Sequence, residues 1–327
     1  MDIGKVPENI LKRSVFKYIH HHRKEVLVHP GIGEDCCAVE TGNGEIMVFS
    51  SDPVTGAGKG AGRIAVHINA NDIASSGAEP VGILASIIMP PGASEADLKE
   101  IMKDISQACD ELGIEIMGGH TEVSDIVKRT VINITCTGKV QKGHFIPAGG
   151  LSEGDDIVMT KWAGIEGTSI IAESKADILL EKLPKCLIET ASSFKQYLSI
   201  VPEARIAAEN GATAMHDVTE GGIFGALWEI GEASGTGIIA DLDKIPIKQE
   251  TIEVCEVFNI NPYMLISSGS LLIGCQHGYH LVEELLRNGI PAAVIGRAAG
   301  GNDRVVVNGE ETRYLVPAVS DELYKVV

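Results

Sequence analysis

The sequence predicts an α/β protein of two domains, and three observations lead to this expectation. The chain has 327 residues, which is enough for two domains of ordinary size. Hydrophobic residues make up 44% of the chain and aromatic residues only 4%, so we expect substantial cores filled mainly by aliphatic side chains. Segments that alternate like strands are interspersed with segments of helical periodicity along the whole chain.

Composition and charge argue against several functional classes. The net charge of -18 argues against nucleic acid as a partner, because phosphate backbones are bound by basic patches. It is compatible with a nucleotide, whose charge a divalent metal and a few backbone amides balance. No apolar run is long enough to span a bilayer, and the N-terminus does not resemble a signal peptide. Seven cysteines without a paired framework indicate a reducing compartment, so we expect a cytoplasmic protein.

Local signals place the helices and the domain boundary. Residues 8–20 carry apolar side chains on one face, which predicts a short amphipathic helix. Residues 92–113 predict the clearest helix, with Ser94 as its N-cap and Gly113 as its C-cap. The turn-rich stretch 147–156 predicts a boundary between an N-terminal domain, residues 1–150, and a C-terminal domain, residues 151–327.

The stretch 62–82, GRIAVHINANDIASSGAEPVG, is the one around which the chain is organised. Asn69, Asn71 and Asp72 lie within an otherwise apolar run, where they are costly to bury without partners. Carboxylate and amide oxygens are the ligands that hard cations prefer, so the stretch favours a metal or phosphate site. A helix whose polar residues cap or turn the chain is the alternative.

Two more aspartates lie in comparable settings. Asp35 follows a glycine loop and precedes a predicted strand. Asp52 follows the predicted strand 46–50, and Pro53 is expected to end that strand because it cannot continue a central one. One such aspartate is more often a turn residue. Three of them, with Asp72, indicate a magnesium–phosphate site.

Two glycine pairs carry further polar residues. In IEIMGGHTEV, Gly118 and Gly119 predict a turn from which the side chains of residues 120–122 project. In MHDVTEGG, a strand is expected to end at Met215 and the glycines to open a helix, whose N-terminus attracts anions. Asp217 and Glu220 would repel a bare phosphate there, so a metal or a cationic ligand group is expected. The glycine loop AGIEGTS, residues 163–169, is a weaker anion-site candidate.

Six motifs together resemble the AIR synthase-related superfamily, which includes aminoimidazole ribonucleotide synthetase, thiamine-monophosphate kinase, selenophosphate synthetase and the hydrogenase maturation protein HypE. They occur in the family order and cover most of the chain: GIGEDCCAV, SDPVTG, GRIAVHINANDIASSGAEP, GGHTEV, HDVTEGGIFGAL and SGSLLIG. The similarity is strongest to HypE-like proteins.

The resemblance implies an N-terminal α/β domain whose sheet pairs across a homodimer in an interface barrel, and a C-terminal α/β sandwich domain. It also implies ATP held with Mg²⁺ at the dimer interface. Asp35, Asp52 and Asp72 match positions that bind the Mg–phosphate group, with Glu34 as a weaker candidate. Asp217 matches an acidic position of the C-terminal domain.

Motifs and resemblance together give a candidate site. The proposed nucleotide-binding residues are Asp35, Asp52, Lys59, Arg63, Asn69, Asn71, Asp72, Gly118, Gly119 and Thr121. The proposed metal ligands are Asp35, Asp52, Asp72, Glu122 and Asp217. His120 and Lys59 are the proposed catalytic residues, and an ordinary loop lysine or a solvent-facing histidine is the alternative reading of each.

Three departures from the family pattern affect the expected function. His120 replaces the aspartate of GGDT, which removes one carboxylate ligand that Glu122 either replaces or does not. Glu220 stands where HypE carries arginine, and the sequence ends in DELYKVV rather than in the cysteine tail that carries the carbamoyl group in HypE. A role in making thiocyanate ligands is therefore not expected.

The sequence favours an ATP-binding, Mg-dependent enzyme that uses ATP to activate an oxygen of a small-molecule or protein-borne acceptor. Such an enzyme would be ligase- or kinase-like and would consume ATP. Two alternatives stay open. One is a HypE-like nucleotide-binding maturation protein without the cysteine chemistry, and the other is a non-catalytic structural dimer. No nucleic acid and no membrane is expected as a partner.

Overall fold

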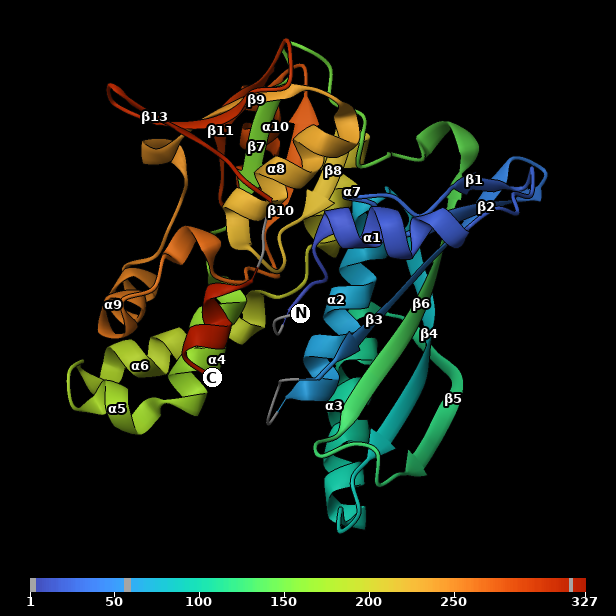
Figure 1. The fold of residues 1–327 in the computed structure, drawn as a ribbon, viewed down its shortest axis with the longest axis vertical. Coiled ribbons are helices and arrows are strands. Elements are labelled where there is room, and N and C mark those ends of the chain that lie inside the picture. Colours follow the sequence, from blue (N-terminus) through green and yellow to red (C-terminus); the bar gives the residue numbers. More distant parts are fainter. Residues whose placement is uncertain (1–3, 56–59, 318–319) are drawn as a thin grey trace. The chain divides into compact units, whose positions relative to one another are not determined.

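The computed structural model describes residues 4–55, 60–317 and 320–327. Two compact units form (Figure 1). Among the described residues, the first unit comprises residues 24–29 and 35–145, and the second comprises residues 4–23, 30–34 and 146–327. The last change from one unit to the other along the chain falls between Phe145 and Ile146.

The first unit is a six-stranded sheet with two long helices on one face (Figure 1). The strand order is β1-β2-β3-β6-β4-β5, and all neighbours are antiparallel except β4 and β5. The elements are β1 (Val26–Val28), β2 (Cys37–Gly42), β3 (Glu45–Val54), α2 (Ala61–Ser75), β4 (Glu79–Met89), α3 (Glu95–Leu112), β5 (Glu115–Val123), β6 (Val131–Gln141) and the 3-10 turn η2 (Lys142–His144).

Helix α3 confirms the helix predicted over 92–113. The Ser94 side chain accepts a hydrogen bond from the Asp97 amide, and the Asp97 side chain accepts one from the Ser94 amide, which is a capping box. Gly113 ends the helix in the left-handed conformation, with a φ of 68°. Both capping signals lie within or next to the helix in the sequence, so they can be recognised without knowledge of the fold.

The turn predicted at Gly118 and Gly119 is wrong, because β5 continues through both glycines, with a shift of register against β4 just before Gly118. A Cβ atom on Gly119 would lie 1.9 Å from the carbonyl oxygen of Ala85 on the adjacent strand β4. Gly119 therefore permits the close parallel approach of β4 and β5 rather than a change of direction. The φ angles of Gly118 and Gly119, 156° and 153°, are conformations that other residues rarely adopt.

The expected end of β3 is also wrong, because the strand continues through Pro53 to Val54. Strand β2 pairs with β3 only as far as Phe49, so the last residues of β3 have an open edge on that side. Proline is tolerated at strand edges. Asp52 therefore lies within a strand, and its backbone conformation is fixed by the pairing with β6.

The second unit contains a seven-stranded sheet in the order β13-β12-β9-β11-β7-β10-β8, antiparallel except for β9 and β12. Its strands are β7 (Asp156–Thr160), β8 (Ala212–Asp217), β9 (Gly237–Asp241), β10 (Leu271–Cys275), β11 (Ala292–Ala299), β12 (Arg304–Asn308) and β13 (Glu311–Tyr314). Strand β8 thus extends past Met215 to Asp217.

Helices of the second unit are mostly short. They are α1 (Glu8–Ser14), α4 (Ile165–Ser174), α5 (Ala176–Leu180), α6 (Lys185–Ser192), α7 (Val201–Glu209), α8 (Gly222–Ser234), α9 (Gln249–Phe258) and α10 (Gly278–Arg287). The 3-10 turns are η1 (Phe16–Tyr18), η3 (Ser193–Tyr197), η4 (Leu242–Lys244), η5 (Pro262–Met264) and η6 (Glu322–Lys325). The helix predicted over 8–20 stops at Ser14. Helix α1 buries no residue, so packing does not support a longer helix.

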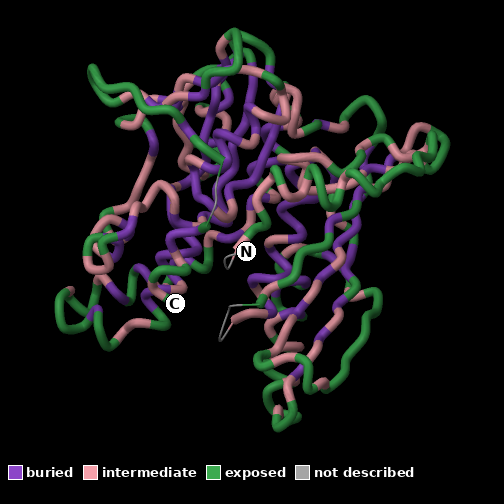
Figure 2. The backbone as a smooth tube through the Cα atoms, viewed as in Figure 1, coloured by how far each residue is buried: buried purple, intermediate pink, exposed green. Residues whose placement is uncertain are grey.

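Two apolar clusters form the core of the second unit (Figure 2). One joins the sheet to α8. The other lies among α4, α6 and α9, and Leu323 and Val326 near the C-terminus pack against it. The C-terminal residues are thus part of the unit's fold.

These two sheets with their helices confirm the predicted two-domain α/β architecture. Among the described residues, the six-stranded sheet is open, with β1 and β5 at its edges. The barrel implied by the resemblance needs a second chain and stays a prediction. No helix in the described ranges has the length and apolar character needed to cross a membrane.

Candidate functional site

Three of the predicted site residues lie together where α2 packs on β3. Ser50 and Asp52 are two residues apart on β3, so their side chains point to the same face of the sheet. That face is covered by α2, because the Ser50 hydroxyl donates a hydrogen bond to Oδ2 of Asp72. Asn69 lies one helical turn from Asp72 and contacts Asp52. The structure therefore brings Asp52, Asn69 and Asp72 into one cluster.

Burial distinguishes the members of this cluster. Asn69 is fully buried and Asp72 is 2% exposed, whereas Asp52 is exposed to solvent. The Cys136 thiol lies opposite Ser50 on β6, and burial raises its pKa to about 12, with a smaller contribution from the negative charge of Asp72. A buried carboxylate and an exposed one beside it are the donor types that a hard divalent cation takes.

The other predicted residues near α2 have different surroundings. Asn71 is buried within α2, and Asp35 is partly buried in the segment before β2. Arg63 makes a two-point ion pair with Glu111 of α3, at 2.7 and 2.6 Å. Its hydrogen bonds lower the pKa of the Glu111 carboxyl. In this state Arg63 joins α2 to α3 rather than facing the cluster. Lys59 lies outside the described residues.

Strand β5 keeps His120 away from this cluster within one chain. Pairing across β6 and β4 brings Asp52 level with Gly119, three strands and roughly 14 Å away. Because successive side chains alternate, His120 and Glu122 point to the opposite face from Asp52. They are exposed, and His120 Nε2 lies 3.2 Å from Glu122 Oε2. Thr121 is exposed between them.

In the second unit, Asp217 ends β8 and is 1% exposed. Its neighbour His216 shares a hydrogen bond with Glu229 of α8, with 3.1 Å between Nε2 and Oε2. Burial alone would raise the pKa of Glu229, but the hydrogen bond to His216 and the charge of Lys5 outweigh it and lower this pKa. The His216–Glu229 pair fixes the orientation of the imidazole next to Asp217.

A carboxylate of the chain itself, that of Asp321, lies at the start of α8. The Gly221 amide donates a hydrogen bond of 2.7 Å to Oδ2 of Asp321 in the C-terminal segment. Glu220 accepts a hydrogen bond of 2.6 Å from the Tyr324 hydroxyl. Within the described residues, Asp321 thus occupies the Gly221 amide and the Tyr324 hydroxyl satisfies Glu220, while the metal or cationic ligand group expected at this helix start stays a prediction. Burial raises the pKa of Asp321 to about 6.

The AGIEGTS loop is not an open anion site. The Gly164 amide donates to the Ser267 hydroxyl at 2.9 Å, and the Gly167 amide donates to the Ile266 carbonyl at 3.0 Å. Glu166 between them is buried, and no described residue gives its Oε2 a hydrogen bond of ordinary geometry. Burial raises the pKa of Glu166 to about 7, although Ser268 nearby partly opposes the shift.

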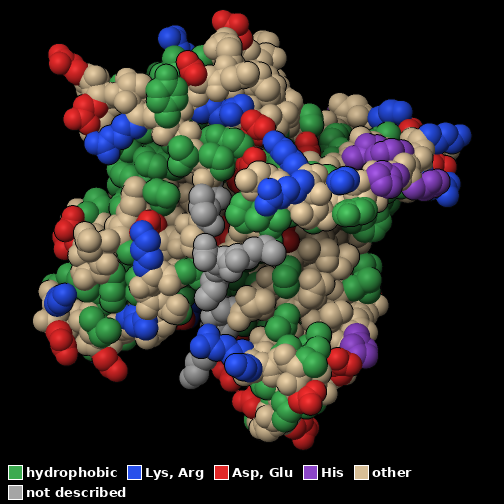
Figure 3. Space-filling model, viewed as in Figure 1, with side chains coloured by type: hydrophobic (Ala, Val, Ile, Leu, Met, Phe, Trp, Pro, Cys, Tyr) green, Lys and Arg blue, Asp and Glu red, His purple; other side chains and the backbone are tan. Residues whose placement is uncertain are grey.

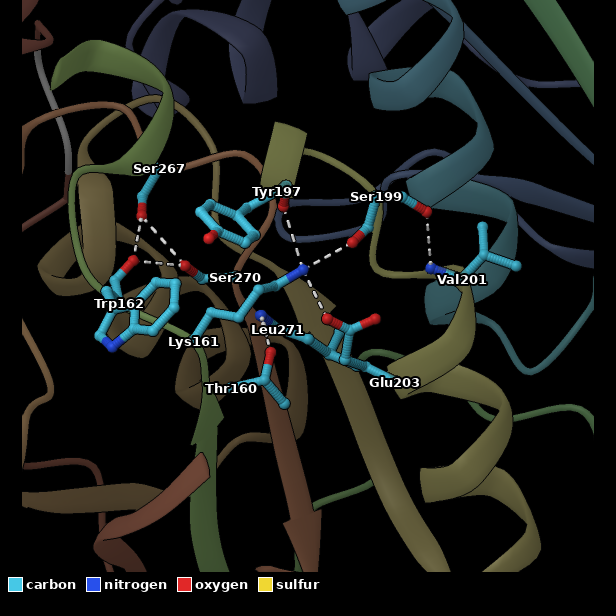
Figure 4. A network of polar contacts seen from close by, with 10 residues as sticks. All are labelled: Thr160, Lys161, Trp162, Tyr197, Ser199, Val201, Glu203, Ser267, Ser270 and Leu271. Carbon is cyan, nitrogen blue, oxygen red and sulfur yellow. Dashed lines mark hydrogen bonds and ion pairs between the residues drawn. The ribbon is translucent and has the colours of Figure 1, made fainter. Parts of the chain in front are cut away.

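A buried lysine secures the segment that precedes this loop (Figure 4). Lys161 Nζ donates to the carbonyls of Tyr197 and Ser199 at 3.0 and 2.6 Å and pairs with Glu203 at 2.5 Å. Burial lowers the pKa of Lys161, and Glu203 partly opposes this. The Ser267 and Ser270 hydroxyls both donate to the carbonyl of Trp162, the residue that follows Lys161. The network holds the SGSLLIG motif against the end of β7.

Two domain models match the chain. The model of the AIR synthase related protein N-terminal domain matches residues 33–140, and that of the C-terminal domain matches residues 152–308. Together they span most of the chain. The chain belongs to the AIR synthase related family.

Relatives within this family carry names from hydrogenase maturation. A Methanocaldococcus jannaschii protein, provisionally named as a hydrogenase expression/formation protein, is 30% identical over 93% of this chain and 91% of its own length. The carbamoyl dehydratase HypE of Cupriavidus necator is 29% identical over 74% of this chain and 69% of its own length.

Solved structures of the family share the fold. A HypE in complex with ATP has a TM-score of 0.73 at 17% identity and covers 99% of this chain and 97% of its own. A HypE–HypF complex gives 0.74 at 21% identity, over 86% and 92%. The Aquifex aeolicus thiamine-monophosphate kinase with AMPPCP and TMP gives 0.73 at 17% identity, over 96% and 99%. These likenesses show that the AIR synthase related fold is common to all of them.

Several residues that contact the predicted site residues could not be found from the sequence. His216 stood next to the chosen Asp217, but its partner Glu229 lies 13 residues further along, on a helix face that only the fold defines. Asp321 lies 100 residues from Gly221, and no local pattern links the two. Ser50 was noted only as the end of a strand.

Proposed function

We propose that the chain binds ATP together with Mg²⁺ and uses ATP to activate an oxygen of an acceptor, in a role related to hydrogenase maturation. The cluster of Asp52, Asn69 and Asp72 is the observation that carries the proposal. It provides two carboxylates on one face of the first unit, next to the Asn69 amide, and carboxylate oxygens are the donors that Mg²⁺ prefers. ATP in a HypE and AMPPCP in a thiamine-monophosphate kinase of the same fold support the nucleotide.

In this proposal, Asp52 and Asp72 would hold Mg²⁺. The other residues predicted from the sequence to bind the nucleotide would position ATP. The metal, when bound, supplies charge that offsets the repulsion between carboxylates and phosphates. Ser50 keeps the Asp72 carboxylate oriented through its hydrogen bond. The contribution of the chain is therefore positioning and electrostatics, as in other reactions at phosphorus.

We infer a protein-borne acceptor in preference to a small molecule. Relatives in this family are named for expression or formation of hydrogenase, and one HypE is seen in a complex with HypF. Acidic and basic side chains are interspersed on the face of the molecule in Figure 3, which argues against nucleic acid as the acceptor.

A homodimer and a cytoplasmic location belong to the same proposal. The face of the first unit's sheet opposite α2 exposes Phe49, Leu84 and Met117, at 36%, 45% and 46%. A second copy would cover these apolar side chains. Sedimentation that shows only monomer at micromolar concentration would count against it. None of the seven cysteines, all within the described residues, forms a disulfide, which is compatible with a reducing compartment.

Nucleotide binding without turnover is the second candidate function. It is favoured by the position of His120, which lies on the opposite face and three strands away from Asp52 within one chain. This proposed catalytic residue therefore does not meet the cluster of Asp52, Asn69 and Asp72 within a single copy.

ATP consumption separates these two functions. The purified protein is incubated with Mg-ATP alone, with candidate protein acceptors and with small-molecule acceptors. The enzyme proposal predicts ADP or AMP formation that rises when the right acceptor is added. Tight binding of ATP with no turnover under any of these conditions would favour the accessory role.

A further inference from the structure

Strand β3 loses its neighbour just before the residues of the candidate site. Strand β2 pairs with β3 from Glu45 only to Phe49. Asp52 lies three residues beyond that point and pairs with β6 on its other side. A strand residue directs its N–H and C=O to the same side, so the Asp52 peptide groups on the β2 side need another partner.

The side chain of Asn69 supplies that partner. Its Oδ1 accepts a hydrogen bond from the Asp52 amide at 2.8 Å, and its Nδ2 donates to the Asp52 carbonyl at 3.2 Å. This two-point contact is the one that a residue of an antiparallel strand would make. Nδ2 also donates to the Ala65 carbonyl of α2 at 3.0 Å. Asn69 is fully buried, so these bonds do not compete with solvent.

Asparagine suits this contact for a chemical reason. A carboxamide presents an acceptor and a donor side by side, whereas an ionised carboxylate has no donor for the Asp52 carbonyl. Asn69 and Asp72 share one face of α2, so the contact ties the main chain of Asp52 to the helix that carries the second carboxylate. The spacing of the two carboxylates is thereby coupled to a single rigid helix.

We propose that Asn69 is a positioning residue that replaces the missing strand beside Asp52 and fixes this carboxylate relative to Asp72. The inference rests on the proposed function, in which both carboxylates hold Mg²⁺. Asn69 then acts on the metal through the backbone of Asp52, not as a ligand.

A double-mutant cycle with Asn69→Ala and Asp52→Asn tests the inference. Calorimetry measures ATP affinity at a series of Mg²⁺ concentrations for the four proteins. Asn69→Ala is expected to weaken the Mg²⁺-dependent affinity about tenfold in the wild-type background and less than about twofold when Asp52 is already Asn. Equal losses in both backgrounds would overturn the inference.

Two controls separate positioning from general destabilisation. Ser76→Ala removes another buried hydrogen bond of the same region, from the Ser76 hydroxyl to the Ile73 carbonyl at 2.7 Å, and is expected to leave Mg²⁺ dependence unchanged. Amide hydrogen exchange of residues 50–52 and 54 is expected to accelerate in Asn69→Ala and in the milder Asn69→Ser but not in Ser76→Ala. Unchanged exchange in both Asn69 variants would overturn the inference.

Failure of the proposed function gives a different result. If Asp52→Asn alone leaves the Mg²⁺ dependence unchanged, then Asp52 does not bind the metal and the assignment of the site itself is wrong. If Asp52→Asn weakens binding but the Asn69 effect is independent of it, only the positioning role is wrong.

Discussion

At the scale of single residues, burial rather than a charge partner shifts the pKa of the Glu166 carboxyl. Glu166 has an ordinary pKa of 4.5 that burial raises to about 7 in the fold. The folded state therefore holds this proton more tightly than the unfolded chain does. Its contribution to folding stability is fully present below about pH 4.5 and is lost as the pH rises to about 7, by up to about 3 kcal/mol.

The variant Glu166→Gln keeps the shape of the protonated carboxyl and removes this titration. It is expected to be more stable than the wild type by about 1–3 kcal/mol at pH 8 and nearly equal at pH 5. Urea denaturation at the two pH values measures the difference. Glu181→Gln, at an exposed site, is the matched control. A constant difference between wild type and Glu166→Gln across this range would show that Glu166 does not titrate as described.

At the scale of helices and strands, the sequence predicted an element correctly where the residues that determine it lie within that element. Helix α3 was predictable because Ser94, Asp97 and Gly113 cap it within its own residues. Strand β5 was not, since Gly118 and Gly119 read as a turn until β4 is placed beside them. Pro53 led to a wrong end for β3 for a similar reason. A proline is tolerated in this strand only because β2 ends before it, which the sequence does not reveal.

The close pairing of β4 and β5 predicts that a side chain at Gly119 destabilises the fold. In Gly119→Ala, the new methyl group would meet the Ala85 carbonyl at 1.9 Å, and the strand must shift or the pairing must break. We expect a loss of about 3 kcal/mol or more in the free energy of unfolding. Gly143→Ala is the control, because a Cβ there meets nothing within 4 Å. Equal stability of the two variants in denaturant titrations would contradict the close approach of β4 and β5.

At the scale of the whole molecule, the order of six short motifs was enough to predict the family and the two-domain α/β fold, and both are confirmed. The candidate site was predictable only in part. Asp52, Asn69 and Asp72 were chosen for their residue types, and the fold does bring them together. The roles of Ser50 and Asn69, and the docking of Asp321 on Gly221, depend on tertiary contacts that no spacing encodes.

The central claim is that the face shared by β3 and α2 binds Mg-ATP through Asp72. Calorimetry of ATP binding with Mg²⁺ and with the metal chelated, on the wild type and on Asp72→Asn, tests it most directly. Asp110→Asn on the exposed side of α3 removes the same charge and serves as the control. We predict Mg²⁺-dependent binding that Asp72→Asn weakens at least about tenfold, or about 1.4 kcal/mol, and that Asp110→Asn leaves unchanged. Equal Mg-ATP affinity in the wild type and Asp72→Asn would contradict the claim.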